Sequence, residues 1–152
     1  MPKHDSDDQG ENEAVPDILD EEIVIKTMYE GIQNFTSMNE AEKPEELLVD
    51  LFKYQRQGLF WLSRQEEGAY RGGILADDMG LGKTVQCIAL MLKNRPKNPD
   101  RKTTLIVGPV AVLRQWKSEL EAKAGKRTFK ILVHHGEDRV KSAKKFMDYD
   151  VV

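Results

Sequence analysis

A short run of glycine, lysine and threonine has the composition of a phosphate-binding loop. The run 80–84, Gly-Leu-Gly-Lys-Thr, stands between a short apolar segment, 72–76, and a stretch with helical periodicity, 84–92. Glycines allow a tight turn whose backbone N–H groups face phosphate oxygens, and the start of a helix adds partial positive charge. Lys83 would then reach the β- and γ-phosphates, and the Thr84 hydroxyl would bind Mg²⁺. The chemistry indicated is the binding of MgATP.

Two other interpretations of this run are weaker. Gly80 and Gly82 could form half of a dinucleotide-binding fingerprint, but that motif needs a small residue where Val85 stands. A purely structural turn would not explain a Lys-Thr pair directly after the second glycine at a strand-to-helix junction. The phosphate-binding interpretation has one departure of its own, because the strict pattern has glycine where this chain has Asp77.

The elements that must position this loop alternate along the chain. Alternation of strands and helices predicts an α/β fold with a parallel sheet and helices on both faces. Residues 44–51 fit either a helix or an extended segment. Apolar periodicity predicts helices over 20–38, 51–68, 83–92 and 112–124, and the basic segment 137–147 is expected to form a surface helix. Short apolar runs predict strands over 72–76, 103–107, 128–133 and 149–152.

Composition divides the chain into parts of opposite charge. Residues 1–50 hold 3 Lys and Arg against 15 Asp and Glu, whereas residues 51–152 hold 20 against 11. We expect a disordered acidic tail over 1–19, a helical or linker segment over 20–50, and one domain over 51–152. The sequence has no secretion signal and no apolar run that could span a bilayer, which disfavours secretion and membrane insertion. The single cysteine, Cys87, agrees with a reducing compartment.

The departure at Asp77 matches a known family. The run 72–86 resembles motif I of the Snf2 family of helicase superfamily 2, whose members do not use glycine at that position. Residues 51–62 resemble the Q motif of the same family at its usual distance upstream. Residues 105–109 with Gln115 and Trp116 resemble motif Ia, and 134–136 with 149–152 resemble the segment leading to motif Ib. The resemblance covers about 44–152, and the 65–68 and 77–78 segments look closest to the repair-type branch that carries a RING finger.

The resemblance implies a three-layer, RecA-like P-loop lobe that uses ATP and Mg²⁺. It also implies double-stranded DNA or a nucleosome as partner, a second RecA-like lobe, and a nuclear location. Lys83 would be the catalytic residue and Gln55 would bind the adenine edge, although a surface glutamine on the helix is the alternative. Tyr54 and Arg56 could flank the nucleotide. The candidate nucleotide-binding residues are Gln55, Asp78, Met79, Gly80, Leu81, Gly82, Lys83 and Thr84.

Basic residues follow the loop in the second half of the chain. Residues 113–145 hold ten Lys and Arg against four Asp and Glu. In the family the motif Ia region touches the DNA backbone, which makes Lys117, Lys123 and Lys126 candidate phosphate contacts, although each could simply be solvated. Trp116 continues an apolar stripe and is expected to pack in the core. His134 and His135 are interpreted as part of a structural turn, because they lack a second pair of metal ligands at suitable spacing.

Hydrolysis by this family also needs an acidic pair on a later strand and arginines from a second lobe. Neither is found in the 152 residues. We therefore expect an ATP-binding part of a DNA-dependent ATPase that remodels chromatin or other protein–DNA complexes but does not turn over ATP alone. A non-catalytic nucleotide- or DNA-binding module is the main alternative. A small metabolic P-loop kinase is a third, which predicts an acceptor-substrate pocket near the loop.

Overall fold

The fold is taken from a computed structural model that describes residues 39–69, 71–96, 98, 102–136 and 139–152. The predicted tail and the predicted helix over 20–38 lie outside these residues. Of the segment 20–50, residues 39–50 are described and contain no helix. They have a turn at Glu45 and Glu46 and otherwise no regular secondary structure, so the ambiguous stretch is not helical.

Helix α2, Lys53–Glu67, confirms the helix predicted over 51–68. It begins after Phe52, whose backbone N–H donates to the side-chain oxygen of Gln55 at 3.0 Å. This contact stabilises the first turn, where backbone N–H groups lack helical partners. Its buried face contains Gln55, Gly58, Leu59, Leu62 and Ser63.

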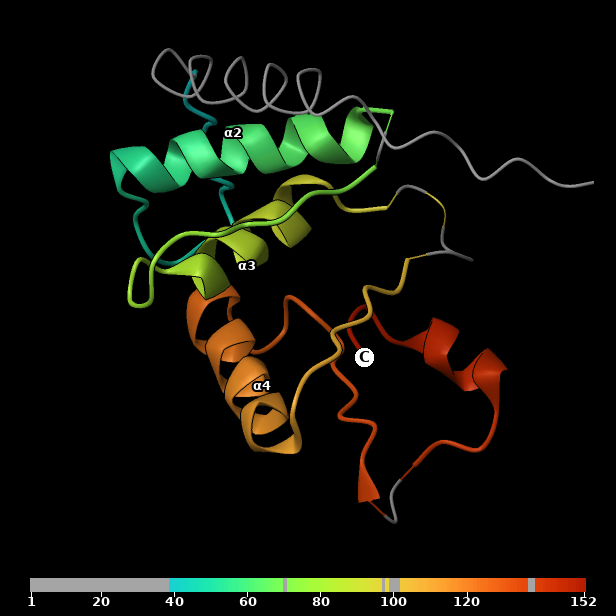
Figure 1. The fold of residues 1–152 in the computed structure, drawn as a ribbon. Helices are drawn as coiled ribbons and strands as arrows, with labels where there is room; N and C mark the ends of the chain where they lie inside the picture. Colours follow the sequence, from blue (N-terminus) through green and yellow to red (C-terminus); the bar gives the residue numbers. More distant parts are fainter. Residues whose placement is uncertain (1–38, 70, 97, 99–101, 137–138) are drawn as a thin grey trace, which may run out of the picture. The chain divides into compact units, whose positions relative to one another are not determined.

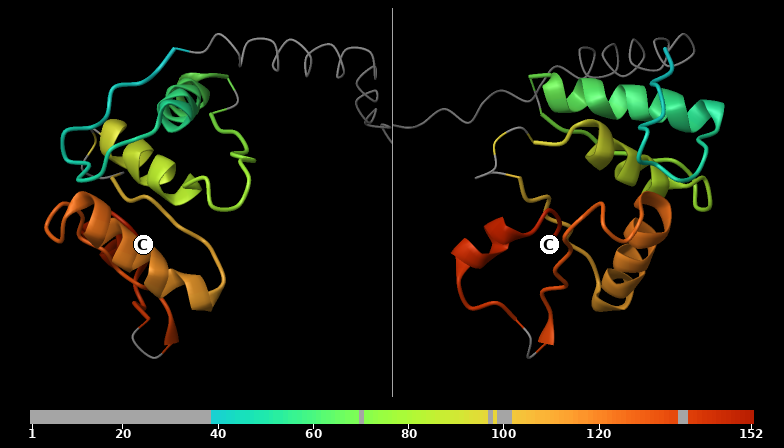
Figure 2. Two further views of the ribbon diagram at one scale, coloured as in Figure 1. Left: turned by 90° about the vertical axis from the view of Figure 1, so that its left-hand side faces the viewer. Right: turned by 180° about the vertical axis from the view of Figure 1, so that it is seen from behind.

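Helix α3, Lys83–Lys93, begins at the predicted residue, directly after Gly82. Its buried residues are Val85, Gln86, Ile88, Ala89 and Leu92. The spacing of the apolar members places them on one face of the helix. The helix contacts both α2 and α4. The three helices follow one another as layers in Figure 1, and the side view in Figure 2 shows the same order.

Helix α4, Val110–Ala124, begins slightly before the predicted residue 112. Pro109 is the N-cap residue, with φ of −59° and a non-helical ψ of 144°, and the helix begins directly after it. The helix ends before Gly125, whose φ of 87° lies in the left-handed region that favours glycine at helix ends. Leu48 ties the preceding segment to this end of α4, because its N–H donates to the Lys123 carbonyl oxygen at 2.7 Å.

The predicted sheet is reduced to two isolated parallel bridges in the described residues. Val151 pairs with Thr104 on one side and with Ile131 on the other. The N–H of Thr104 donates to the Asp150 carbonyl at 2.8 Å, and the N–H of Leu132 donates to the Val151 carbonyl at 2.9 Å. The parallel direction agrees with the prediction, but the pairing is too short for any described segment to form a strand. Segment 72–76 has no regular secondary structure and makes no bridge to another described residue.

The prediction of a basic helix over 137–147 is wrong for the residues that the structure describes. A 3₁₀ helix, η3, spans Ala143–Asp148 instead. Lys141, Lys144 and Lys145 crowd like charges at helical spacing, which disfavours a longer α-helix. The N–H of Tyr149 also donates to the Phe146 carbonyl at 3.0 Å, the short-range bond that a 3₁₀ turn uses.

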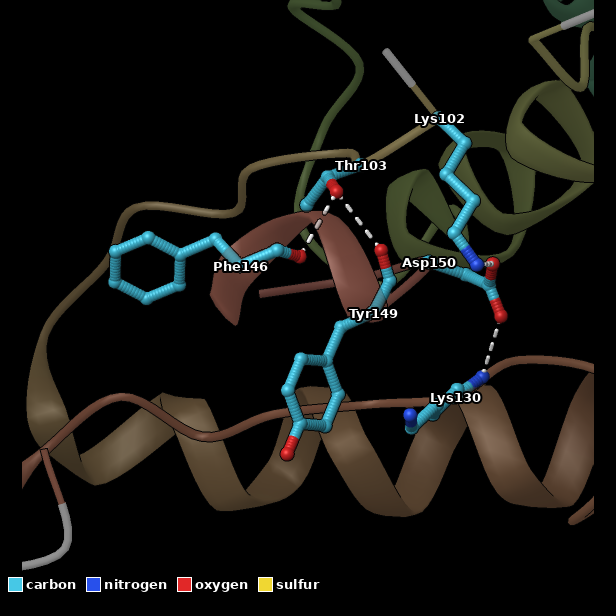
Figure 3. A network of polar contacts seen from close by, with 6 residues as sticks. All are labelled: Lys102, Thr103, Lys130, Phe146, Tyr149 and Asp150. Carbon is cyan, nitrogen blue, oxygen red and sulfur yellow. Dashed lines mark hydrogen bonds and ion pairs between the residues drawn. The ribbon is translucent and has the colours of Figure 1, made fainter. Parts of the chain in front are cut away.

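A polar network fastens η3 to the bridged segments (Figure 3). The Thr103 hydroxyl lies 3.1 Å from the Phe146 carbonyl oxygen and 2.8 Å from that of Tyr149. The Asp150 carboxylate accepts from the backbone N–H of Lys130 at 2.7 Å and pairs with the Lys102 ammonium at 3.0 Å. Side chains thus join three segments whose backbone pairing is short.

The core lies between the helices and the bridged segments. Leu59 and Ile88 are fully buried where α2 meets α3, and Leu120 brings α4 to the same cluster. Leu47 and Val151 reach it from outside the helices. Among the residues that the structure describes, no helix is long and apolar enough to cross a membrane.

Candidate functional site

The glycine-rich loop lies between segment 72–76 and the start of α3. The helix start agrees with the prediction, but the predicted strand over 72–76 is not formed, and Ile74 within it is 86% exposed. Gly80 has φ of 88° and Gly82 has φ of 79°, so both occupy conformations that favour glycine. A Cβ on Gly82 would lie 2.4 Å from the Gln55 amide nitrogen. Gly82 is therefore required both by its dihedral angles and by the close approach of α2.

Lys83 extends its ammonium back over the loop. Its Nζ donates to the carbonyl oxygens of Asp77 at 2.6 Å and Asp78 at 3.0 Å. The cation is thereby held beside the loop backbone at the N-terminus of α3, where helix N–H groups favour anions. Phosphate oxygens are charged and are therefore stronger partners for this ammonium than neutral carbonyl oxygens.

The remaining loop residues are open to solvent. Met79 is 95% exposed, and Asp78, Gly80 and Leu81 are also exposed. Thr84 is half-buried in the first turn of α3, next to Lys83. Its hydroxyl is an oxygen ligand of the kind Mg²⁺ prefers. The exposed loop and the hydroxyl beside it fit a bound magnesium nucleotide.

Gln55 is only 4% exposed, so the interpretation as a surface glutamine is wrong. Its Nε2 donates to the Leu81 carbonyl at 3.1 Å, and its Oε1 accepts from the N–H of Phe52. The amide therefore links the start of α2 to the loop. This role was missed in the sequence, although a glutamine three residues after a helix boundary is a known capping signal.

Aromatic and charged neighbours extend this end of α2. The rings of Phe52 and Tyr54 stack with centroids 5.8 Å apart, and both side chains are exposed. Arg56 forms an ion pair with Glu40, and its carbonyl accepts from the N–H of Ala41 at 3.0 Å. Tyr54 thus lies beside Gln55 on an open surface, whereas Arg56 is engaged with the segment before α2.

Gln86 is a second polar residue that sequence reasoning missed. It is fully buried, and its Nε2 donates to the Asp77 carboxylate at 2.8 Å. The signal available was its position on the buried face of α3, where an amide among apolar residues needs a hydrogen-bond partner. That partner is the residue at which the loop departs from the strict phosphate-binding pattern.

Each of the two candidate DNA-binding lysines on α4 is paired with a glutamate. Lys117 and Lys123 lie on α4, where Glu121 and Glu119 approach them at 3.9 and 2.9 Å. Lys117 and Lys123 are six residues apart, so their side chains leave α4 in different directions. Lys126 is exposed in the turn after α4. The charges of Lys117 and Lys123 are thereby partly balanced within α4.

An apolar cavity of about 450 Å³ lies between α4, the bridged segments and η3. Its described lining contains no residue of the loop 77–84, so it is separate from the phosphate-binding candidate. Trp116 borders it and packs against the core, as predicted. The side chains that line it include Leu105, Leu113, Trp116, Leu120, Ile131, Phe146 and Val151.

His134 has structural contacts. Its ring meets the Phe146 ring edge-on with centroids 4.9 Å apart, and its Nδ1 accepts from the N–H of Val140 at 3.3 Å. These contacts agree with its interpretation as part of a structural turn. The neighbouring His135 is exposed.

Comparisons with known proteins agree with the motifs. The family model described as "SNF2-related domain" matches residues 54–152. The chain is 48% identical over 133 residues to the ATP-dependent helicase ULS1 of Saccharomyces cerevisiae, covering 84% of this chain and 8% of that protein. It is 32% identical over 196 residues to the DNA repair protein RAD5B of Arabidopsis thaliana, covering 80% of this chain and 15% of that protein.

A solved structure extends the likeness to the fold. The chain matches the SWI2/SNF2 ATPase core of Sulfolobus solfataricus in complex with double-stranded DNA, with a TM-score of 0.62 and 35% identity, over 74% of this chain and 23% of that one. The chain thus spans less than a quarter of each of these proteins. The matched family, the motif at 72–86 and the geometry of its loop together place this chain in the Snf2 family of helicase superfamily 2.

Proposed function

We propose that the loop 77–84 and the adjoining ends of α2 and α3 bind MgATP. One observation carries the proposal: the Lys83 ammonium lies against two loop carbonyls at the start of α3, within a loop whose glycines adopt positive φ. The cation, the helix N-terminus and the exposed backbone converge on one place, which suits a triphosphate.

Each candidate residue then has a distinct role. Lys83 contacts the β- and γ-phosphates and is the catalytic residue of this segment, the backbone of Asp78–Gly82 surrounds the phosphates, and the Thr84 hydroxyl holds Mg²⁺. Gln55 contacts the adenine edge. Its amide is already bound to the Leu81 carbonyl, so adenine recognition would be linked to the position of the loop.

The wider activity is a DNA-dependent ATPase that remodels chromatin or other protein–DNA complexes in the nucleus. The solved relative bound to double-stranded DNA supports the DNA partner. We place phosphate contacts at Lys117, Lys123 and Lys126, and a nucleosome as the larger substrate. The relative named as a DNA repair protein supports the repair-type branch. The parallel bridges at Val151 support a three-layer, RecA-like lobe that works with a second lobe.

Nucleotide binding and turnover are separate claims. Residues 1–152 are proposed to bind MgATP and not to hydrolyse it alone, because acidic and arginine groups that act on the γ-phosphate come from other parts of the motor. A non-catalytic nucleotide- or DNA-binding module is the second candidate. The partial pairing of the α4 lysines limits the charge available to DNA, which favours the nucleotide-binding form of this module over the DNA-binding form.

MgATP binding and phosphate release, measured on one preparation with and without duplex DNA, test the proposal. We expect saturable binding with no DNA-stimulated release. Robust DNA-stimulated release that disappears in Lys83→Ala would show that this segment is a complete ATPase. Absence of nucleotide binding, with DNA binding retained, would favour the DNA-binding module.

A further inference from the structure

The buried Gln86 side chain of α3 lies between Gly58 of α2 and Asp77 of the loop. The Gln86 side chain is fully buried, and its Nε2 donates to the Asp77 carboxylate at 2.8 Å. Asp77 in turn offers its backbone carbonyl to the Lys83 ammonium at 2.6 Å. The same residue therefore receives the amide of α3 on its side chain and the loop cation on its backbone.

Gly58 of α2 provides the space for this amide. A Cβ built on Gly58 would lie 2.0 Å from the Gln86 Oε1, a distance that no side chain could accept without moving the amide. The described residues offer Oε1 no hydrogen-bond partner. Burial of an unpaired carbonyl oxygen is unfavourable, so the bond from Nε2 to Asp77 is the contact that compensates for holding Gln86 there.

We infer that Gln86 is a positioning residue for phosphate binding, which holds Asp77 so that the carbonyls of Asp77 and Asp78 keep the Lys83 ammonium over the loop. The inference rests on the proposed function of this loop. It also explains the departure from the strict pattern, because a glycine at position 77 would have no carboxylate for Gln86 to bind. The Asp77 side chain fixes the loop backbone through its hydrogen bond with Gln86, and a glycine could not make this bond.

The chain offers a matched control. Asn94 at the end of α3 donates to the Glu66 carboxylate of α2 at 2.7 Å, so it also makes a side-chain hydrogen bond to a carboxylate. That bond is exposed and lies at the other end of α3 from the loop. Asn94→Ala removes a comparable polar contact without touching Asp77 or Lys83.

The test compares the full 152-residue wild type with Gln86→Leu, Asn94→Ala, Gln86→Glu and the exchange pair Asp77→Asn with Gln86→Glu. Gln86→Glu sets two carboxylates against each other, whereas the exchange pair restores one donor and one acceptor. We expect Gln86→Leu to weaken MgATP binding about tenfold, the size of a lost hydrogen bond to a charged group. Asn94→Ala should stay within about twofold of wild type, and the exchange pair should recover most of the affinity lost in Gln86→Glu.

Amide hydrogen exchange over residues 77–83 provides a readout that needs no nucleotide. Exchange is compared at one temperature below unfolding. Faster exchange in Gln86→Leu than in Asn94→Ala supports the role of Gln86 in holding Asp77. This result would stand even if the wild type did not bind MgATP, in which case only the proposed function fails. Equal exchange and equal affinity in these two variants would overturn the inference. If Gln86→Glu alone does not fold, recovery of folding in the double variant Asp77→Asn with Gln86→Glu would support the contact between the two residues. Failure of the double variant to fold, together with unchanged amide hydrogen exchange in Gln86→Leu, would contradict it.

Discussion

The Gln55 amide nitrogen donates to the Leu81 carbonyl oxygen at 3.1 Å and so joins the first turn of α2 to the middle of the glycine-rich loop. The two residues are 26 positions apart in the chain, yet the contact lies beside the Gly82 backbone. Under the proposed function, this contact would couple binding of a base at Gln55 to binding of phosphates at the loop.

Replacement of Gln55 by alanine should lower the preference for ATP over GTP, because the amide that contacts the adenine edge is lost while Lys83 and the loop backbone remain. The loss of the capping contact with Phe52 should also reduce the free energy of unfolding by about 1 kcal/mol. Competition of ATP and GTP for the same site measures the preference. Gln57→Ala, on the same helix, serves as the control, and an unchanged ATP to GTP ratio in Gln55→Ala would remove Gln55 from base recognition.

Gly58→Ala should destabilise the chain although alanine favours a helix by about 1 kcal/mol over glycine. The added Cβ would lie 2.0 Å from the Gln86 Oε1 in a buried position, and such overpacking costs about 1–3 kcal/mol. Chemical denaturation measures the net effect. In the background of Gln86→Ala the same change should lose its penalty, since the clashing oxygen is gone. A stabilising Gly58→Ala in the wild-type background would show that α2 and Gln86 are not in close contact.

The helices could be predicted because their apolar residues recur at helical spacing over several turns. Leu59 and Leu62 of α2, and Ile88 and Leu92 of α3, lie on the buried faces that this spacing predicts. The helix predicted over 137–147 rested on the basic composition of this segment, whereas clustered lysines and short-range bonds favour η3. Strand pairing could not be predicted, since it depends on which segments lie beside Val151 and not on their composition.

The loop could be predicted from its local pattern of glycine, lysine and threonine, and its helix start at Lys83 is confirmed. The contacts that hold it could not, because they join distant residues. Gln86 meets Asp77 within the motif, but its burial depends on Gly58 of another helix. A single glycine in a helix was the signal that a neighbour approaches closely there.

Stability at low pH should depend on Asp150. Burial alone would raise the pKa of this carboxyl, but the Lys130 backbone N–H and the Lys102 ammonium outweigh it and lower the pKa below its ordinary 3.8. The folded state therefore favours the ionised form, so the contribution to stability is present above pH 3.8 and is lost as the pH falls through the lower folded value. Melting temperatures of wild type and Asp150→Asn should differ at pH 7 and converge in acid. A difference that stays constant with pH would contradict this account.

Cys87 should react slowly with thiol reagents in the folded chain. The Cys87 side chain on α3 is half-buried, and this burial raises the pKa of its thiol. The fraction of reactive thiolate is therefore lowered. Alkylation at pH 8 should accelerate when α3 opens in urea, so its rate reports on local unfolding next to the loop. Equal rates in buffer and in denaturant would show that α3 is not packed as described.

The most direct test of the account is a calorimetric titration of the full chain with MgATP, performed on wild type and on Lys83→Ala. The wild type should bind one nucleotide, and the variant should lose at least about tenfold in affinity, because the phosphates lose a charge-assisted contact. A matching thermal unfolding profile for both proteins would show that the fold is kept. Equal affinity of the two proteins for MgATP would contradict the claim that this loop binds the triphosphate.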